Sequence, residues 1–120
     1  MLSSVVGTMV SNNLREVQGL FGDLLDDRKT AIRYAKVLAD KSGIQPHSVG
    51  ETMVTSEIRE LSKQWRKSAL VFCCDELRKG MTLSRSVGRF DLISECEAML
   101  DEVEYFMDLA IRTMPTMPTE

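Results

Sequence analysis

The sequence predicts an all-α protein, a single-domain antiparallel bundle of four or five helices. Apolar residues recur at intervals of three and four along most of the chain, as they do on one face of a helix. Only 3 prolines and 7 glycines interrupt the 120 residues, and no stretch alternates apolar and polar residues as a half-buried strand does. With 43% hydrophobic and 28% charged residues, the composition is typical of a globular domain that has its own core.

Two helices are expected in the first third of the chain, over 4–25 and 27–41. Asp26 and Asp27 either continue the first helix or cap the second. Gly43 suits the left-handed position that follows a helix, and Ile44 can then fold back on the last turn. The apolar stripe of the first helix is formed by Val10, Leu14, Val17, Phe21 and Leu24.

A third helix is expected in the middle of the chain. It begins either at a capping box formed by Ser48 and Glu51 or later, at Thr55 or the serine after it. Gly80 is expected to end this helix, because glycine is common just after a helix. Its apolar stripe is formed by Val54, Ile58, Leu61, Trp65, Ala69 and Phe72.

The last helix is expected over 91–112, with Asp91 as its N-cap. Residues 113–120 contain two prolines and are expected to form a flexible tail, so the helical bundle spans 1–112. The apolar stripe of the last helix is formed by Leu92, Cys96, Met99, Val103, Phe106, Ala110 and Met114.

The segment SALVFCC, from Ser68 to Cys74, contains six apolar residues in succession, too many for one face of a helix. Three interpretations remain open at this point. In the first, the third helix is central and enclosed by its own chain. In the second, Leu70, Val71 and Cys74 form an exposed patch that a partner or a second copy covers. In the third, the segment is a strand, since Val, Phe and Cys favour sheets.

Charge is unevenly distributed along the chain, whose formal net charge is −3. From 91 to 112 there are seven acidic residues and one arginine, whereas residues 1–90 carry a basic excess. The acidic side of the last helix either steers a basic protein partner or balances basic residues of the third helix. The acidic residues chosen as protein-binding candidates are Glu97, Asp101, Glu104 and Asp108.

A basic row on the third helix is the candidate for nucleic-acid binding. Arg59, Lys63 and Arg66 are spaced four and three residues apart, with Lys67 alongside, and such a row can follow a phosphate backbone. The competing interpretation is a solvated helix face.

Neither a metal site nor a catalytic site is predicted, and no cofactor or small-molecule substrate is expected. The 3 cysteines and the single histidine, His47, lack the spacing of zinc ligands, and no nucleophile motif accompanies the histidine. An odd number of cysteines gives no disulfide framework, which indicates a reducing compartment, the cytoplasm. The first residues have no basic leader and no long apolar run, so neither a signal peptide nor a membrane span is expected.

The sequence therefore predicts a small cytoplasmic adaptor or regulatory protein that is not an enzyme. It is expected to act by docking to another protein or to a second copy of itself, and to be homo-oligomeric. A helical nucleic-acid-binding protein is the alternative.

Overall fold

The computed structural model describes residues 2–113, and the side chains of residues 2–109. It contains four α-helices and, within that range, no strand. The helices are α1 (Leu2–Leu24), α2 (Asp27–Lys41), α3 (Ser56–Ser86) and α4 (Phe90–Thr113), and two short 3₁₀ turns, η1 (Pro46–Ser48) and η2 (Glu51–Met53), lie between α2 and α3. The predicted all-α class is confirmed, whereas a fifth helix is absent from the described part of the chain. The predicted tail lies outside the described residues, except that Thr113 ends α4.

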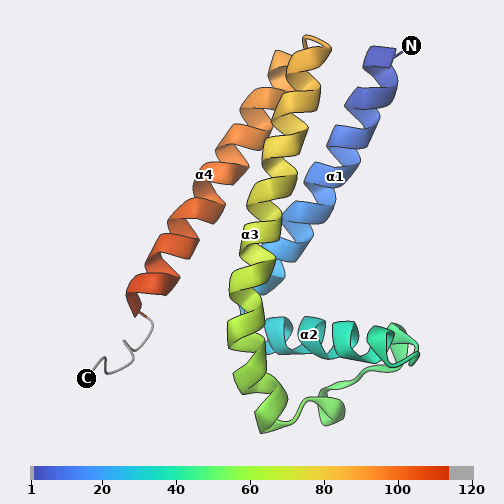
Figure 1. Cartoon of the computed structure of the whole chain (residues 1–120), viewed down its shortest axis with the longest axis vertical. Helices are drawn as coiled ribbons and strands as arrows, with labels where there is room; N and C mark the ends of the chain where they lie inside the picture. Colours follow the sequence, from blue (N-terminus) through green and yellow to red (C-terminus); the bar gives the residue numbers. More distant parts are fainter. Residues whose placement is uncertain (1, 114–120) are drawn as a thin grey trace.

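The helices do not all lie along one another. Figure 1 shows α1, α3 and α4 side by side, while α2 begins beside the lower half of α3 and projects away from it to one side. The longest helix, α3, has 31 residues and packs against each of the other three. The molecule measures 48 × 40 × 20 Å, so along its shortest axis it is about two helix diameters thick.

Most helix ends follow the expected chemistry. The carboxylate of Asp26 accepts a hydrogen bond from the backbone N–H of Lys29 (2.9 Å), so a second helix begins there rather than the first continuing. The hydroxyl of Thr55 accepts from the N–H of Ile58 (3.2 Å), which selects the later of the two expected starts for α3. After α2, Gly43 has a φ of 79°, in the left-handed region, and the next N–H donates to the Ala39 carbonyl (2.8 Å).

Gly80 does not end α3, and this prediction was wrong. A Cβ at Gly80 would lie 3.2 Å from the Cys96 sulfur of α4 and 3.5 Å from a methyl carbon of Val10 in α1. The glycine therefore lies inside the helix, where it lets three helices approach one another closely. The helix ends six residues later, and the left-handed residue that follows it is Gly88, with a φ of 72°.

Asp91 does not cap α4 either. The helix begins at Phe90, and the N–H groups of Leu92 and Ile93 donate to the carbonyl of Arg89. The carboxylate of Asp91 instead accepts two hydrogen bonds from the Arg89 guanidinium, at 3.0 and 3.1 Å. This side-chain pair joins the α3–α4 turn to the first turn of α4.

The core lies where α1, α3 and α4 meet. The predicted stripe of α1 is buried in full, and on α4 Leu92, Cys96 and Val103 are buried while Met99 and Phe106 pack against them. The rings of Phe21 and Phe106 meet edge to face at 5.9 Å. The predictions for Ala110 and Met114 fall outside the described side chains.

The predicted stripe of α3 was wrong in register. Ala69 is buried, but Leu61 is 40% exposed and Phe72 52% exposed. The reason is that α1 and α4 pack on a neighbouring side of the helix. From the sequence, residues of that side were expected in the exposed patch (Leu70, Cys74) and at the end of the helix (Gly80). The buried residues of α3 are Ser62, Ala69, Leu70, Cys73, Cys74, Leu77, Gly80 and Ser84.

Polar contacts hold α2 at the point where α1, α2 and α3 meet. Thr30, which is 1% exposed, has its hydroxyl 2.8 Å from the carbonyl oxygen of Asp26 and 3.2 Å from that of Asp23. From α3, the guanidinium of Arg66 donates to the Thr30 hydroxyl (3.2 Å) and to the carboxylate of Asp27. These contacts hold the first turn of α2 against α3 at the end of α1.

We predict that Gly80→Val lowers the free energy of unfolding by about 1–3 kcal/mol, because its side chain presses on Cys96 and Val10. The matched control is Gly19→Ala in α1, where nothing lies within 4 Å of an added Cβ. That substitution should raise the free energy of unfolding by about 0.5–1 kcal/mol. Urea denaturation followed by circular dichroism measures both values. A Gly80→Val protein as stable as the wild type would contradict the close packing.

Candidate functional site

The structure encloses most of SALVFCC within its own chain. Leu70 is 2% exposed and Cys74 3% exposed, so the expectation that they form an exposed patch was wrong. The segment is helical and central: it belongs to α3, which α1 and α4 cover along this side. Val71, by contrast, is 44% exposed and available to a partner.

Part of the predicted protein-binding set is brought together. Val71, Glu104 and Asp108 line a shallow hollow between α3 and α4, over the buried Cys74. Arg78 of α3 spans this hollow and forms a salt bridge with Glu104 at 3.1 Å. The other two predicted acids, Glu97 and Asp101, lie outside the hollow, are exposed and form no salt bridge with a described side chain.

The basic row of α3 is not a continuous positive face. The Arg66 side chain is 17% exposed and donates hydrogen bonds to Asp27 and Thr30. It is therefore not the exposed, unpaired phosphate contact that the sequence predicted. Lys63 forms a salt bridge with Glu60 (3.4 Å). Arg59 and Lys67 are exposed. Carboxylates therefore interrupt the row that the nucleic-acid interpretation requires.

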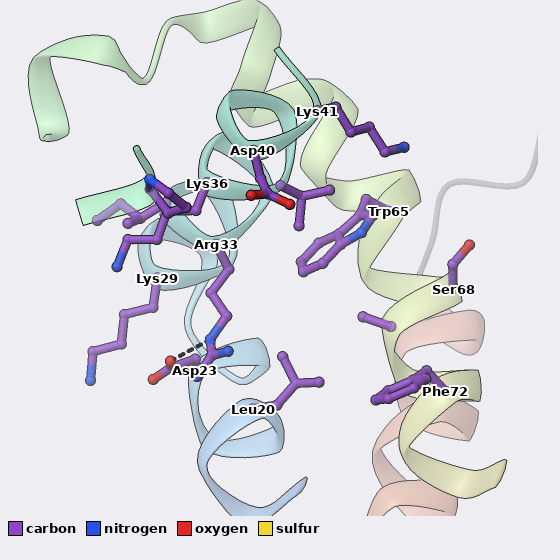
Figure 2. A pocket seen from close by; sticks show the side chains of 14 residues that line it. Leu20, Asp23, Lys29, Arg33, Lys36, Asp40, Lys41, Trp65, Ser68 and Phe72 are labelled. Atoms are coloured by element: carbon purple, nitrogen blue, oxygen red, sulfur yellow. Dashed lines mark hydrogen bonds and ion pairs between the residues drawn. The ribbon is translucent and has the colours of Figure 1, made fainter. Parts of the chain in front are cut away.

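An open cleft lies in the angle between α2 and the body of the molecule, and we call it the α2–α3 cleft. It has a volume of about 880 Å³. Figure 2 shows Trp65 and Phe72 facing it from α3 and Leu20 from α1, with charged side chains of α2 along the other wall. The apolar residues that line it are Leu20, Ile32, Val37, Pro46, Trp65, Ala69 and Phe72.

Aromatic side chains form the floor of the cleft. Trp65 is partly buried against the ring of Tyr34, with the ring centroids 5.7 Å apart, so α2 supports it from one side. Phe72 has no such cover and is 52% exposed. Large, half-exposed aromatic rings in a concave surface are typical of the anchoring centre of a protein interface.

The rim of the cleft is predominantly basic. Four cationic side chains and two carboxylates line it, and one of these carboxylates, Asp23, already binds Arg33 at 2.7 Å. The ammonium groups of Lys29, Lys36 and Lys41 form no salt bridge with any side chain that the structure describes. With four cationic side chains against the two carboxylates, Asp23 and Asp40, the lining carries a net charge of +2.

Sequence reasoning missed this cleft because it assigned Trp65 and Phe72 to the core. A signal was present: α3 carries a second apolar stripe, through Leu70, Cys73 and Leu77, on a different side. A small bundle has too few neighbouring helices to cover two apolar stripes on different sides of one helix completely. Which stripe is uncovered depends on where the neighbouring helices pack.

The three thiols are free and buried, and burial raises the pKa of each. The effect is largest at Cys73, whose pKa rises from 9.0 to about 11. Such thiols stay protonated at neutral pH and are poor nucleophiles. Among residues 2–109, no three His, Cys, Asp or Glu side chains are placed to hold a metal ion.

Comparison of the chain with known protein families, with curated proteins and with solved structures found no match. In the described part of the chain, none of the helices combines the length and the apolar character needed to cross a bilayer.

We predict that the buried thiol of Cys73 makes the fold sensitive to alkaline pH. In the unfolded chain the thiol loses its proton near pH 9, whereas in the folded protein its pKa is about 11. The stability that depends on the neutral thiol is therefore fully present below pH 9 and is lost as pH rises towards 11, by up to about 3 kcal/mol.

Denaturation curves of the wild type and of Cys73→Ser, recorded across this pH range, isolate the effect, because serine does not titrate there. The wild type should lose more stability than the variant between the two limits. Identical pH dependence in the two proteins would show that the thiol is not buried in its neutral form.

Proposed function

We propose that this protein is a small cytoplasmic adaptor that docks an acidic amphipathic helix of another protein in the α2–α3 cleft. In this proposal an antiparallel bundle of α1, α3 and α4 is the rigid support, and α2 is the arm that completes the binding site. The observation that carries the proposal is the half-exposed aromatic floor of the cleft, with Phe72 52% exposed, beneath a basic rim.

The shape of the cleft favours a helix over a small molecule. Small-ligand pockets usually enclose most of the ligand surface. Here the cleft is walled by α2 on one side and by α1 and α3 on the other, and Phe72 remains half exposed. A helix laid in such a groove places apolar residues at every third or fourth position against the floor. Trp65 and Phe72 are seven residues apart on α3, which is about two helical turns, so their spacing matches that of the apolar residues on such a partner helix.

The charge of the rim favours an acidic partner. Lys29, Lys36 and Lys41 have no salt-bridging carboxylate among the described residues, so carboxylates of a partner helix can pair with them. The three free cysteines, with thiols buried and no disulfide, support a reducing location. Nucleic acid is the weaker candidate, because Arg66 is committed to Asp27 and Glu60 neutralises Lys63.

We predict that Phe72→Ser removes partner binding while leaving the fold intact. The ring is half exposed, so its loss should change the free energy of unfolding by less than about 1 kcal/mol. Leu77→Ser is the matched control for the fold: Leu77 is 1% exposed on the same helix, and its substitution should cost about 2–5 kcal/mol.

A photo-crosslinking amino acid at position 72, incorporated in cells, tests the binding itself. It should join the protein to an acidic helical segment, which mass spectrometry of the adduct identifies, and Lys36→Glu should reduce the yield. The same group at Lys67, roughly 140° around α3, is the control and reports nucleic-acid contact. Absence of any protein adduct at position 72, or nucleic-acid adducts at position 67 alone, would reject the proposal.

A further inference from the structure

A second apolar surface lies at the other end of the molecule, on the first half of α1. Leu2, Val5 and Met9 are spaced three and four residues apart, so they share one side of the helix. They are 72%, 57% and 55% exposed. Beside them on α3, Leu83 is 40% exposed and lines the same groove between α1 and α3 as Met9. We call these four residues the α1 stripe.

The α1 stripe is not needed for the protein's own core. The opposite side of the same turns is already buried: Val10 and Leu14 belong to the core, and Gly7 packs against the guanidinium of Arg89 and the side chain of Leu92. The helix therefore has an apolar side for its own chain and a second apolar side that faces solvent.

The first half of α1 carries no charged residue, although Glu16 of α1 and the Glu76–Lys79 ion pair of α3 line the groove that Met9 and Leu83 share. Residues 2–14 contain no Asp, Glu, Lys or Arg, and the first charged residue is Arg15. About a quarter to a third of the residues on a soluble protein's surface are normally charged. The hydroxyl of Thr8 donates to the Ser4 carbonyl at 3.0 Å, so even this polar neighbour has its donor satisfied within the helix. Desolvation therefore costs least at Leu2 and Val5, which do not line that groove.

From these observations we infer that the α1 stripe is the surface through which two copies of this chain associate about a two-fold axis. In a two-fold interface each residue near the axis meets its own counterpart, so a charged residue there faces an identical charge. An uncharged apolar stripe meets this requirement. A partner selected by charge would find no complement on this part of α1, and interfacial membrane helices usually carry Lys or Arg on their polar face.

Association at this end leaves the α2–α3 cleft accessible. The cleft begins at Leu20, fifteen residues beyond Val5, which is about 22 Å further along α1. A dimer joined at the α1 stripe therefore displays two clefts, one on each copy.

The self-association is tested by sedimentation velocity over a wide concentration range. Wild-type protein should shift from the 13.5 kDa chain mass towards twice that mass as concentration rises. Met9→Glu and Val5→Glu should each weaken dimerisation on the order of tenfold or more, because each places two like charges across the axis. The control is Val71→Glu, the same change at an exposed valine on α3, which should dimerise like the wild type.

A cysteine cross-link supplies a second readout that does not depend on weakened binding. Under mild oxidation Val5→Cys or Met9→Cys should form a covalent dimer far faster than Gln18→Cys, an exposed position on the same helix. The native thiols are buried and stay reduced, so they do not interfere.

A wild type that stays at 13.5 kDa at every concentration would overturn the inference. So would a dimer that persists in both glutamate variants, or one that only Phe72→Ser dissociates. Binding of the monomeric wild type to phosphatidylcholine vesicles, lost in Met9→Glu, would assign the stripe to a lipid surface instead.

Discussion

The contact of Arg66 with the first turn of α2 determines the shape of this protein. Its guanidinium donates to the Asp27 carboxylate and to the hydroxyl of Thr30. That hydroxyl lies 3.2 Å from the carbonyl oxygen of Asp23, in the last turn of α1, and 2.8 Å from that of Asp26, the N-cap of α2. Three helices are thereby joined at one point. The start of α2 is fixed there, and from this point the helix projects away from α3 at a steep angle instead of running along α1, as Figure 1 shows.

The open cleft follows from that placement. The side of α3 that carries Leu70, Cys73 and Leu77 is covered by α1 and α4. The side that carries Trp65 and Phe72 faces α2 and the end of α1, where Leu20 lines the cleft, and Phe72 stays half exposed. Because α2 projects away from the other helices, an open angle is left between it and α3, and aromatic rings and lysines line this angle. The cleft and the α1 stripe lie towards opposite ends of α1, so one chain can display two independent surfaces.

Residues close in sequence predicted where the helices lie better than they predicted which helix faces pack together. The core residues of α1 and the helix ends marked by Asp26, Thr55 and Gly43 depend on residues close in sequence, and they were predictable for that reason. Gly80 was misread as a stop because the sulfur and the methyl group that require a glycine come from α4 and α1. On α3, apolar residues occur on every side, so only the packing of distant segments decides that Leu70 is buried and Phe72 is exposed.

The proposed docking site exists only if α2 stands away from the bundle and leaves the cleft open. Small-angle X-ray scattering of the monomer, extrapolated to zero concentration, tests this arrangement most directly. The structure has a radius of gyration of 16.7 Å, whereas a closely packed domain of this length would have about 14 Å. A measured value at or above the structure's own supports the open arrangement. A value near about 14 Å would mean that α2 folds back over Trp65 and Phe72, and the proposed docking site would not exist.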